Sequence, residues 1–337
     1  MPNIMLTYRC NLRCPYCFAN EFVNRDKTDI TVRNFLKAVS FITRDGTSDI
    51  GLIGGEPTLH PGFGEIMDLL TANPKVQRIT LYTNGLLLDR FIPQVTNPKV
   101  RMLVNCNSPA ITGEEGYACV KRNLDELFLR HNMKGRLKLG INLYRDDMDY
   151  SYIMELLPRY GLERLRISVA VPDFSAVGET DVLEYFRKKK PFLMRFFRDM
   201  DSIRVLPHYD CNHPPYCIWT EEERKWLEAY AARYPESNGN LAAPEAVCVP
   251  AIDILPNLQA VRCFGMSDFL KVPIGDFDCV EDLRRYFLNE IDSVAVKLAA
   301  NEVCGDCYGR KTGYCYGGCL GFKASRIRAC NEAMEKL

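Results

Sequence analysis

The chain has 337 residues and a mass of 38.5 kDa, and its 47% hydrophobic residues exclude wholesale disorder. Its 43 basic and 43 acidic residues give no net charge, which argues against nucleic acid or an anionic membrane as the main partner. No apolar run approaches the ~18 residues of a membrane-spanning helix. The first ten residues also lack the basic and apolar pattern of a signal peptide, so we expect a cytoplasmic protein.

Short β-rich runs alternate with helical patterns over the first part of the chain. The predicted strands are 3–7, 49–53, 77–83, 101–105, 136–143 and 164–171. The predicted helices between them are 32–43, 63–71, 114–130 and 150–160. Repeated strand–helix units predict an α/β fold with parallel strands joined by right-handed crossovers. Periodicity alone leaves an open sheet and a partial barrel as alternatives.

The next part of the chain is predicted to be helical at 182–199, with an interruption at Pro191. Residues 206–217 are rich in Pro, His and Tyr and predict a loop, where we place a domain boundary. A helix is predicted over 220–234 with Thr220 as its N-cap. A linker at 235–245 and a further helix at 279–298 follow.

The fifteen cysteines are an odd number, so complete disulfide pairing is impossible, and thiols in a chain without an export signal indicate metal binding or catalysis. Three of them, Cys10, Cys14 and Cys17, lie in one short loop. Such a loop can turn three thiolates toward one point, and three thiolates on a four-iron cluster leave one iron free to bind a substrate or cofactor. A zinc site and free buried thiols are the alternatives, although zinc normally has a fourth Cys or His nearby.

This loop resembles that of the radical SAM enzymes, whose three-cysteine motif carries an aromatic residue, here Tyr16, before the third cysteine. A second similarity is the stretch Gly54-Gly55-Glu56-Pro57, which follows the next predicted strand. The resemblance implies a partial (β/α)6 TIM-like barrel with a small cysteine-rich C-terminal domain. It also implies that the three cysteines hold a [4Fe-4S] cluster and that S-adenosyl-L-methionine (SAM) chelates the fourth iron.

The same resemblance suggests which residues contact SAM. The backbone near Tyr16 would lie by the adenine, and Gly54, Gly55 and Glu56 would hold the methionine amine. Three more residues are candidates by position. Asn105 would lie near the methionine moiety, Arg122 near its carboxylate and Asn142 near the ribose. One departure is that the Ser-x-Asp-Gly of many peptide-modifying relatives is replaced here by residues 105–108.

The cysteines after residue 247 resemble the SPASM extension of some radical SAM enzymes, which holds auxiliary [4Fe-4S] clusters. One cluster would take Cys248, Cys263 and Cys319, and the other would take Cys304, Cys307, Cys315 and Cys330. The first set lacks a fourth ligand, so either its last iron is open or Cys211 or Cys217 completes it. One or two zinc sites built from the same thiols are the alternative.

The resemblance therefore implies a radical SAM barrel at 1–205, a bridging loop and helix at 206–247, and a SPASM-like domain at 248–337. The implied activity is that of an oxidoreductase, in which a 5′-deoxyadenosyl radical abstracts hydrogen from a residue of a peptide or protein and oxidises or crosslinks it. Among His208, Asp210 and His213 we favour Asp210 as the base. A reductant such as flavodoxin or ferredoxin, and a separate leader-binding protein, are the expected partners.

Two alternatives to this function stay open. A radical SAM enzyme of the same kind could oxidise or epimerise a small molecule. A non-catalytic iron–sulfur or zinc module is the alternative from a different class, and it would hold metal in the same cysteines without cleaving SAM.

Overall fold

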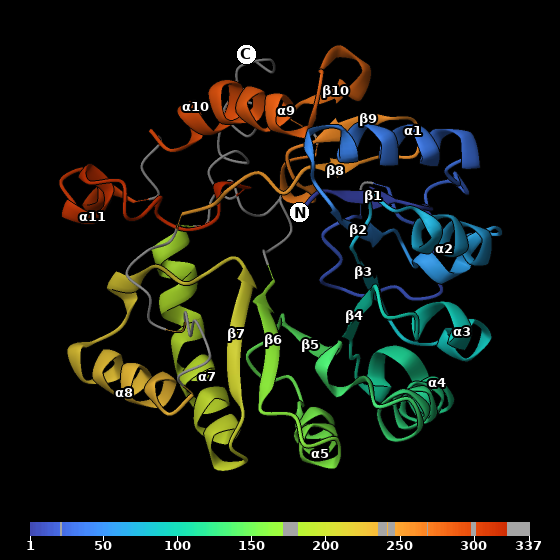
Figure 1. Ribbon diagram of the computed structural model, residues 1–337. Coiled ribbons are helices and arrows are strands. Elements are labelled where there is room, and N and C mark those ends of the chain that lie inside the picture. The colour runs from blue at the N-terminus through green and yellow to red at the C-terminus, as the bar shows by residue number, and fades with distance from the viewer. Residues whose placement is uncertain are drawn as a thin grey trace. The chain divides into compact units, whose positions relative to one another are not determined.

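The computed structural model describes every residue except 21, 171–180, 235–240, 242–246, 268, 298–300 and 322–337. The chain forms two compact units, both drawn in Figure 1. The first unit contains Met1–Gly140 and Pro250–Leu288, and the second contains Ile141–Val249 and Asn289–Leu337. The predicted division at residues 205 and 247 stays a prediction.

The first unit is built on a sheet in which β1 occupies the middle. The strand order is β10-β9-β8-β1-β2-β3-β4-β5, and the neighbours from β8 to β5 pair in parallel, whereas β8, β9 and β10 pair antiparallel. The strands are β1 (Asn3–Met5), β2 (Asp49–Ile53), β3 (Arg78–Thr83), β4 (Val100–Asn105), β5 (Leu137–Leu143), β8 (Asp253–Ile254), β9 (Gln259–Val261) and β10 (Lys271–Pro273).

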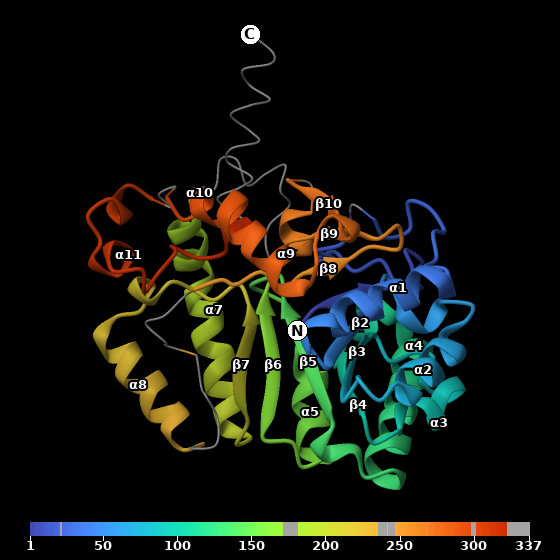
Figure 2. The same cartoon turned by 45° about the horizontal axis from the view of Figure 1, so that its top comes forward.

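The helices of the first unit connect successive strands, and Figures 1 and 2 show α1 to α4 on the outer side of β1 to β4. They are α1 (Val32–Ile42), α2 (Phe63–Ala72), α3 (Ile92–Val95), α4 (Pro109–Asp125) and α9 (Val280–Phe287). α1 begins at the N-cap Thr31, and its buried side chains share one face, as the sequence pattern predicts. α4 begins five residues before the predicted start, is kinked at Gly113, and continues into a π-helical turn, Glu126–Arg130.

The second unit contains the end of β5 with two further parallel strands, β6 (Arg164–Val169) and β7 (Leu206–Cys211). Its helices are α5 (Ser151–Arg159), α7 (Val182–Ser202), α8 (Glu221–Ala232), α10 (Ser293–Ala295) and α11 (Tyr308–Lys311). The alternation of parallel strands with helices is that of a partial (β/α)6 barrel, and the predicted α/β fold class is confirmed.

The prediction of a loop over 206–217 is wrong for residues 206–211, which form β7. Pro207 suggested a loop, but β7 is at the end of the strand order, where a missing backbone donor is tolerated. The prediction of a break at Pro191 is also wrong, because α7 continues through it. Burial of an aromatic face of α7 that includes Phe186, Phe192 and Phe196 stabilises the helix against the loss of one backbone hydrogen bond.

Within the described part of the chain, no helix has the length and apolar character needed to cross a membrane.

The predicted N-cap of α8 is confirmed. Thr220 Oγ1 accepts a hydrogen bond from the amide of Glu223 at 3.2 Å, and the Glu223 carboxylate accepts one from the Thr220 amide at 2.7 Å. This reciprocal pair is a capping box, which satisfies two backbone donors at the start of the helix. Glu223 also forms an ion pair with Lys190 of α7 at 3.1 Å, so the cap joins two helices of the second unit.

We expect Thr220→Ala to lower the free energy of unfolding by about 1 kcal/mol, because the side-chain acceptor of the cap is lost. Thr220→Ser keeps the hydroxyl and should retain most of the stability. Denaturant unfolding of anaerobically purified protein, followed by far-UV circular dichroism, measures both. An alanine variant as stable as the parent would contradict the assignment of this cap.

Candidate functional site

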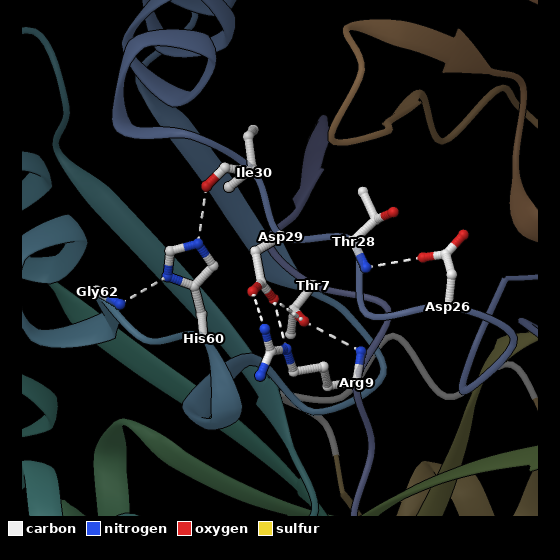
Figure 3. Close-up of polar contacts among 8 residues, drawn as sticks. All are labelled: Thr7, Arg9, Asp26, Thr28, Asp29, Ile30, His60 and Gly62. Carbon is white, nitrogen blue, oxygen red and sulfur yellow. Dashed lines mark hydrogen bonds and ion pairs between the residues drawn. The ribbon is translucent and has the colours of Figure 1, made fainter.

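The residues just before the cysteine loop (residues 10–17) are held by side-chain hydrogen bonds in the first unit. Arg9 donates from Nε to Asp29 Oδ1 at 3.1 Å and from Nη2 to Asp29 Oδ2 at 2.6 Å, in the two-point geometry that favours Arg–carboxylate pairs. Thr7 Oγ1 donates to the same carboxylate at 2.6 Å and accepts from the Arg9 amide at 3.0 Å (Figure 3). These contacts fix the direction in which the chain enters the loop.

The imidazole of His60 joins two neighbouring segments of the same unit (Figure 3). Its Nδ1 accepts from the Gly62 amide at 3.0 Å, so Nε2 carries the proton and donates to the Ile30 carbonyl oxygen at 2.8 Å. The ring therefore connects the segment that carries Asp29 to the turn that follows Gly54–Pro57. It has no thiol among these contacts and acts as a structural brace.

The far side of the loop is anchored by Asn24 and by apolar packing. The Cys10 amide donates to Asn24 Oδ1 at 2.9 Å, and Asn24 adopts a left-handed backbone with φ of +60°, which asparagine tolerates. Phe18 and Phe22 pack on Phe264, with ring centroids 5.5 and 6.0 Å apart. Cys17 packs on the same apolar cluster, so the segment that follows β9 supports the cysteine loop.

The three loop thiols are all partly buried and lie within electrostatic reach of one another. Burial raises the pKa of Cys10 to about 12, with smaller contributions from the charges of Glu56, Cys14 and Cys17. Burial likewise raises the pKa of Cys14 to about 11 and that of Cys17 in the same direction. Ligation to a metal would remove these protons, because the thiolate is the ligand.

A single metal ion and an iron–sulfur cluster place different demands on three thiols. Among the described residues, no three His, Cys, Asp or Glu side chains converge closely enough to hold one metal ion. A zinc site needs all its ligands at ~2.0–2.3 Å from one point, whereas a [4Fe-4S] cluster takes each thiolate at a different iron. Three thiols that do not meet at one point are compatible with an iron–sulfur cluster.

The glycines after β2 lie directly against the backbone of the cysteine loop. The Gly55 amide donates to the Thr7 carbonyl oxygen and the Glu56 amide to that of Arg9, both at 2.8 Å. A Cβ on Gly55 would lie 2.3 Å from the Arg9 oxygen and 3.0 Å from Cys10 Cβ. Only glycine allows this approach, which gives a local reason for the Gly-Gly pair.

Glu56 is fully buried and connects the ends of β2 and β3. Its Oε1 accepts from Thr58 Oγ1 at 2.6 Å and Thr83 Oγ1 at 2.7 Å, and its Oε2 accepts from the Asn84 amide at 2.7 Å. The Asn84 side chain donates to Asn11 Oδ1 at 2.7 Å, which extends the network into the cysteine loop. Burial raises the pKa of Glu56, although these hydrogen bonds oppose the shift. Oε2 keeps one acceptor position for a further donor.

The end of β4 contributes two asparagines. Asn107 Oδ1 accepts a hydrogen bond from the Tyr16 hydroxyl and lies 3.8 Å from Cys14 Sγ. Asn107 was not among the predicted site residues. The sequence feature that could have identified it is its position directly after a predicted strand. Asn105 Oδ1 is buried without a hydrogen-bond partner in the described part of the chain, so this acceptor is available to a ligand.

In the second unit, the structure brings Asn142 and Asp210 together through Arg166, a residue that the sequence analysis did not select. Arg166 donates to Asn142 Oδ1 at 3.1 Å and to Asp210 Oδ2 at 3.0 Å, and Ser168 also donates to Asn142. Arg122, the remaining candidate, is exposed near the end of α4, and no hydrogen bond or ion pair joins it to the cysteine loop within the described residues.

The predicted auxiliary cysteines are divided between the units. Cys263 follows β9 in the first unit, whereas the second unit contains Cys248, Cys304, Cys307, Cys315 and Cys319. Cys330 lies outside the described residues. The thiols of Cys211 and Cys319 are hydrogen-bonded to each other, and this contact lowers the pKa of Cys211.

Comparisons with curated proteins give partial matches. A Caenorhabditis elegans protein named molybdenum cofactor biosynthesis protein moc-5 is 28% identical over 182 residues, which are 48% of this chain and 30% of that protein. A GTP 3′,8-cyclase from Clostridium perfringens (strain 13 / Type A) is 27% identical over 206 residues, which are 56% of this chain and 62% of that enzyme. The matched region is therefore less than two thirds of the length of either relative.

Comparison with solved structures gives a likeness in fold. The crystal structure of Streptococcus suis SuiB superimposes with a TM-score of 0.58 at 14% identity, covering 95% of this chain and 73% of that one. SuiB bound to its precursor peptide SuiA gives a TM-score of 0.57 at 15% identity. Residues 4–112, which contain the cysteine loop and Gly54–Pro57, match the family model described as the radical SAM superfamily. Residues 4–112 of the chain are therefore similar to the radical SAM superfamily.

Proposed function

We propose that this enzyme generates a 5′-deoxyadenosyl radical from SAM and uses it to abstract hydrogen from a small polar molecule. The observation that carries the proposal is the close backbone contact between the three-cysteine loop and the glycines after β2. The names of the matched relatives, which include GTP 3′,8-cyclases, favour a small-molecule substrate. Oxidation of that substrate, which makes the chain an oxidoreductase, and a cytoplasmic location are part of the proposal.

Most of the residues that would hold the loop cluster and the methionine part of SAM are in the first unit. Cys10, Cys14 and Cys17 would bind the [4Fe-4S] cluster, which when present supplies the electron that cleaves SAM. Glu56 keeps one acceptor position on Oε2, and Asn105 Oδ1 is a buried acceptor without a partner in the described residues; both suit the methionine amine. Tyr16 is held by Asn107, which would keep the adenine-side backbone in place.

The polar group around Arg166 is the candidate for orienting the substrate. Arg166 contacts Oδ2 of Asp210 and leaves Oδ1 to accept a proton, which supports Asp210 as the base. Asn142 lies in the same group and is retained as the proposed ribose contact. Arg122 is retained only as a positional candidate for the methionine carboxylate.

A peptide substrate is the second candidate, because the fold likeness to SuiB extends over 95% of the chain rather than over the radical SAM region alone. A leader-binding partner is proposed only for a peptide substrate. A reductant such as flavodoxin or ferredoxin is proposed for either substrate class. Auxiliary [4Fe-4S] clusters in the C-terminal cysteines would accept an electron from the substrate in either case.

Cys14→Ala tests the function directly. We expect anaerobically reconstituted Cys14→Ala to lose reductive formation of 5′-deoxyadenosine by at least ~100-fold, because the cluster loses one of three protein ligands. Cys119→Ala is the matched control, since this thiol donates to the Leu86 carbonyl oxygen, away from the three thiols. Chromatographic measurement of 5′-deoxyadenosine after dithionite reduction gives the result. Full cleavage by Cys14→Ala, or none by the parent, would contradict the proposal.

Gly55→Ala tests the close contact between Gly55 and the backbone of the cysteine loop. The new Cβ would overlap the Arg9 carbonyl, so we expect the cysteine loop to shift and the chain to bind fewer than half of the irons of the loop cluster. Gly135→Ala is the control, because a Cβ there meets nothing within 4 Å. Iron and sulfide analysis measures the loss, and equal iron in both variants would refute the role of this contact.

The substrate class can be tested by coupling. We expect a metabolite fraction below about 1,000 Da to increase 5′-deoxyadenosine formation above the background seen without substrate, because a substrate held next to the radical reacts with it. A digest of cytosolic protein, matched for mass concentration, is the comparison. Stimulation by the peptide digest alone would favour the second candidate over the first.

A further inference from the structure

Three thiols of the second unit line one cavity, and one of them, Cys217, is not among the cysteines that the resemblance assigns to this set. A cavity of about 350 Å³ brings Cys217, from the turn after β7, together with Cys307 and Cys315. The remaining residues that line it are Tyr216, Tyr308, Gly309 and Tyr314. Three thiols lie near enough to Cys217 to interact with it electrostatically: Cys315, Cys304 and Cys307. Cys304 therefore lies close to the same group.

The segment 304–317 is folded around its own sulfurs. The Cys307 amide donates to the Cys304 carbonyl oxygen at 3.4 Å, and the Cys315 amide donates to that of Gly309 at 3.0 Å. A Cβ on Gly309 would lie 3.8 Å from Cys307 Sγ and 3.6 Å from Cys315 Cβ. The Gly317 amide donates to Cys315 Sγ at 3.2 Å, and such N–H···S bonds tune iron–sulfur clusters.

Local contacts hold the turn that carries Cys217. It lies in the short 3-10 turn Tyr216–Ile218, between β7 and the capping box that starts α8. The Arg224 guanidinium of α8 stacks on the Tyr216 ring at 4.7 Å, which holds the turn against the helix. The Cys217 residue is exposed, so it does not serve as a core hydrophobe.

The second upstream cysteine belongs to a different group. Cys211 is hydrogen-bonded to Cys319, a residue of the other predicted ligand set. The two upstream thiols are thus sorted to different partners, although only five residues separate them in the chain. This sorting favours the set of Cys304, Cys307 and Cys315 as the partners of Cys217.

We propose that Cys217, Cys304, Cys307 and Cys315 together hold one auxiliary [4Fe-4S] cluster, with Cys217 in the place that the family resemblance gives to Cys330. Four thiolates complete the ligand set of such a cluster, so every iron is bound by the protein and the site carries electrons rather than substrate. The Arg310 guanidinium, which donates to the Cys304 carbonyl oxygen at 3.4 Å, offsets the negative charge of the thiolates. The site goes beyond the proposed function, since it needs no SAM to form.

The first experiment uses the full chain with Cys10, Cys14 and Cys17 all changed to Ala, so that the result is independent of SAM cleavage. After anaerobic reconstitution, we expect Cys217→Ala in this background to lose about four irons and four sulfides per chain. Cys330→Ala in the same background is the comparison and should retain this cluster. The proposal would be overturned if Cys217→Ala kept the iron content of the triple-Ala chain. It would also be overturned if the triple-Ala chain bound one zinc ion and no sulfide.

A second experiment needs no substitution and therefore does not depend on whether the variant folds. Iodoacetamide labelling of the unaltered chain, read by peptide mass spectrometry, should modify Cys217 at least ~10-fold more slowly in reconstituted protein than after chelator treatment, because a ligating thiolate is not free to react. Cys279, which contacts Asp282 at 3.4 Å, is the internal control and should react equally in both. Equal labelling of Cys217 in both forms would overturn the proposal.

Discussion

The approach of Gly55 to the backbone of Arg9 is the contact on which the candidate site depends. Three cysteines in an isolated loop would have many conformations, and ordering them costs about 1–2 kcal/mol per residue in backbone entropy alone. Here the loop is held as a continuation of the β1–β2 pairing, by amide donors of Gly55 and Glu56 to carbonyl oxygens at 2.8 Å. The sheet therefore provides the order that the thiols need, and only a residue without a Cβ permits it.

Glu56 extends this constraint to the next strand. A buried carboxylate is costly unless its oxygens are hydrogen-bonded, and here donors from Thr58, Thr83 and Asn84 satisfy them. Because Asn84 also holds Asn11, a change at any of these positions is transmitted to the cysteine loop. The end of each of the first three strands thus contributes to one polar network at the site.

The sequence was sufficient for the features that depend on local pattern. Helices α1 and α2 and strands β2 to β4 lie within a residue of their predicted bounds, because hydrophobic periodicity and turn residues decide them. β7 and the continuous α7 were mispredicted, because edge position and aromatic packing outweigh the local effect of proline there. Asn107 and Arg166 were not predicted as site residues because their hydrogen-bond partners, Tyr16 and Asp210, are 91 and 44 residues away in the chain.

The position of β1 has a consequence for synthesis of the chain. Its buried residues Ile4 and Met5 lie between β2 and β8, and the side chain of Asn3 is hydrogen-bonded to Asp253, 250 residues later. At about 5–20 residues per second, roughly 12–50 s elapse on the ribosome before β8 emerges. Throughout that interval one edge of β1 is unpaired and open to association with other nascent chains, so a holding chaperone would be most useful during that window.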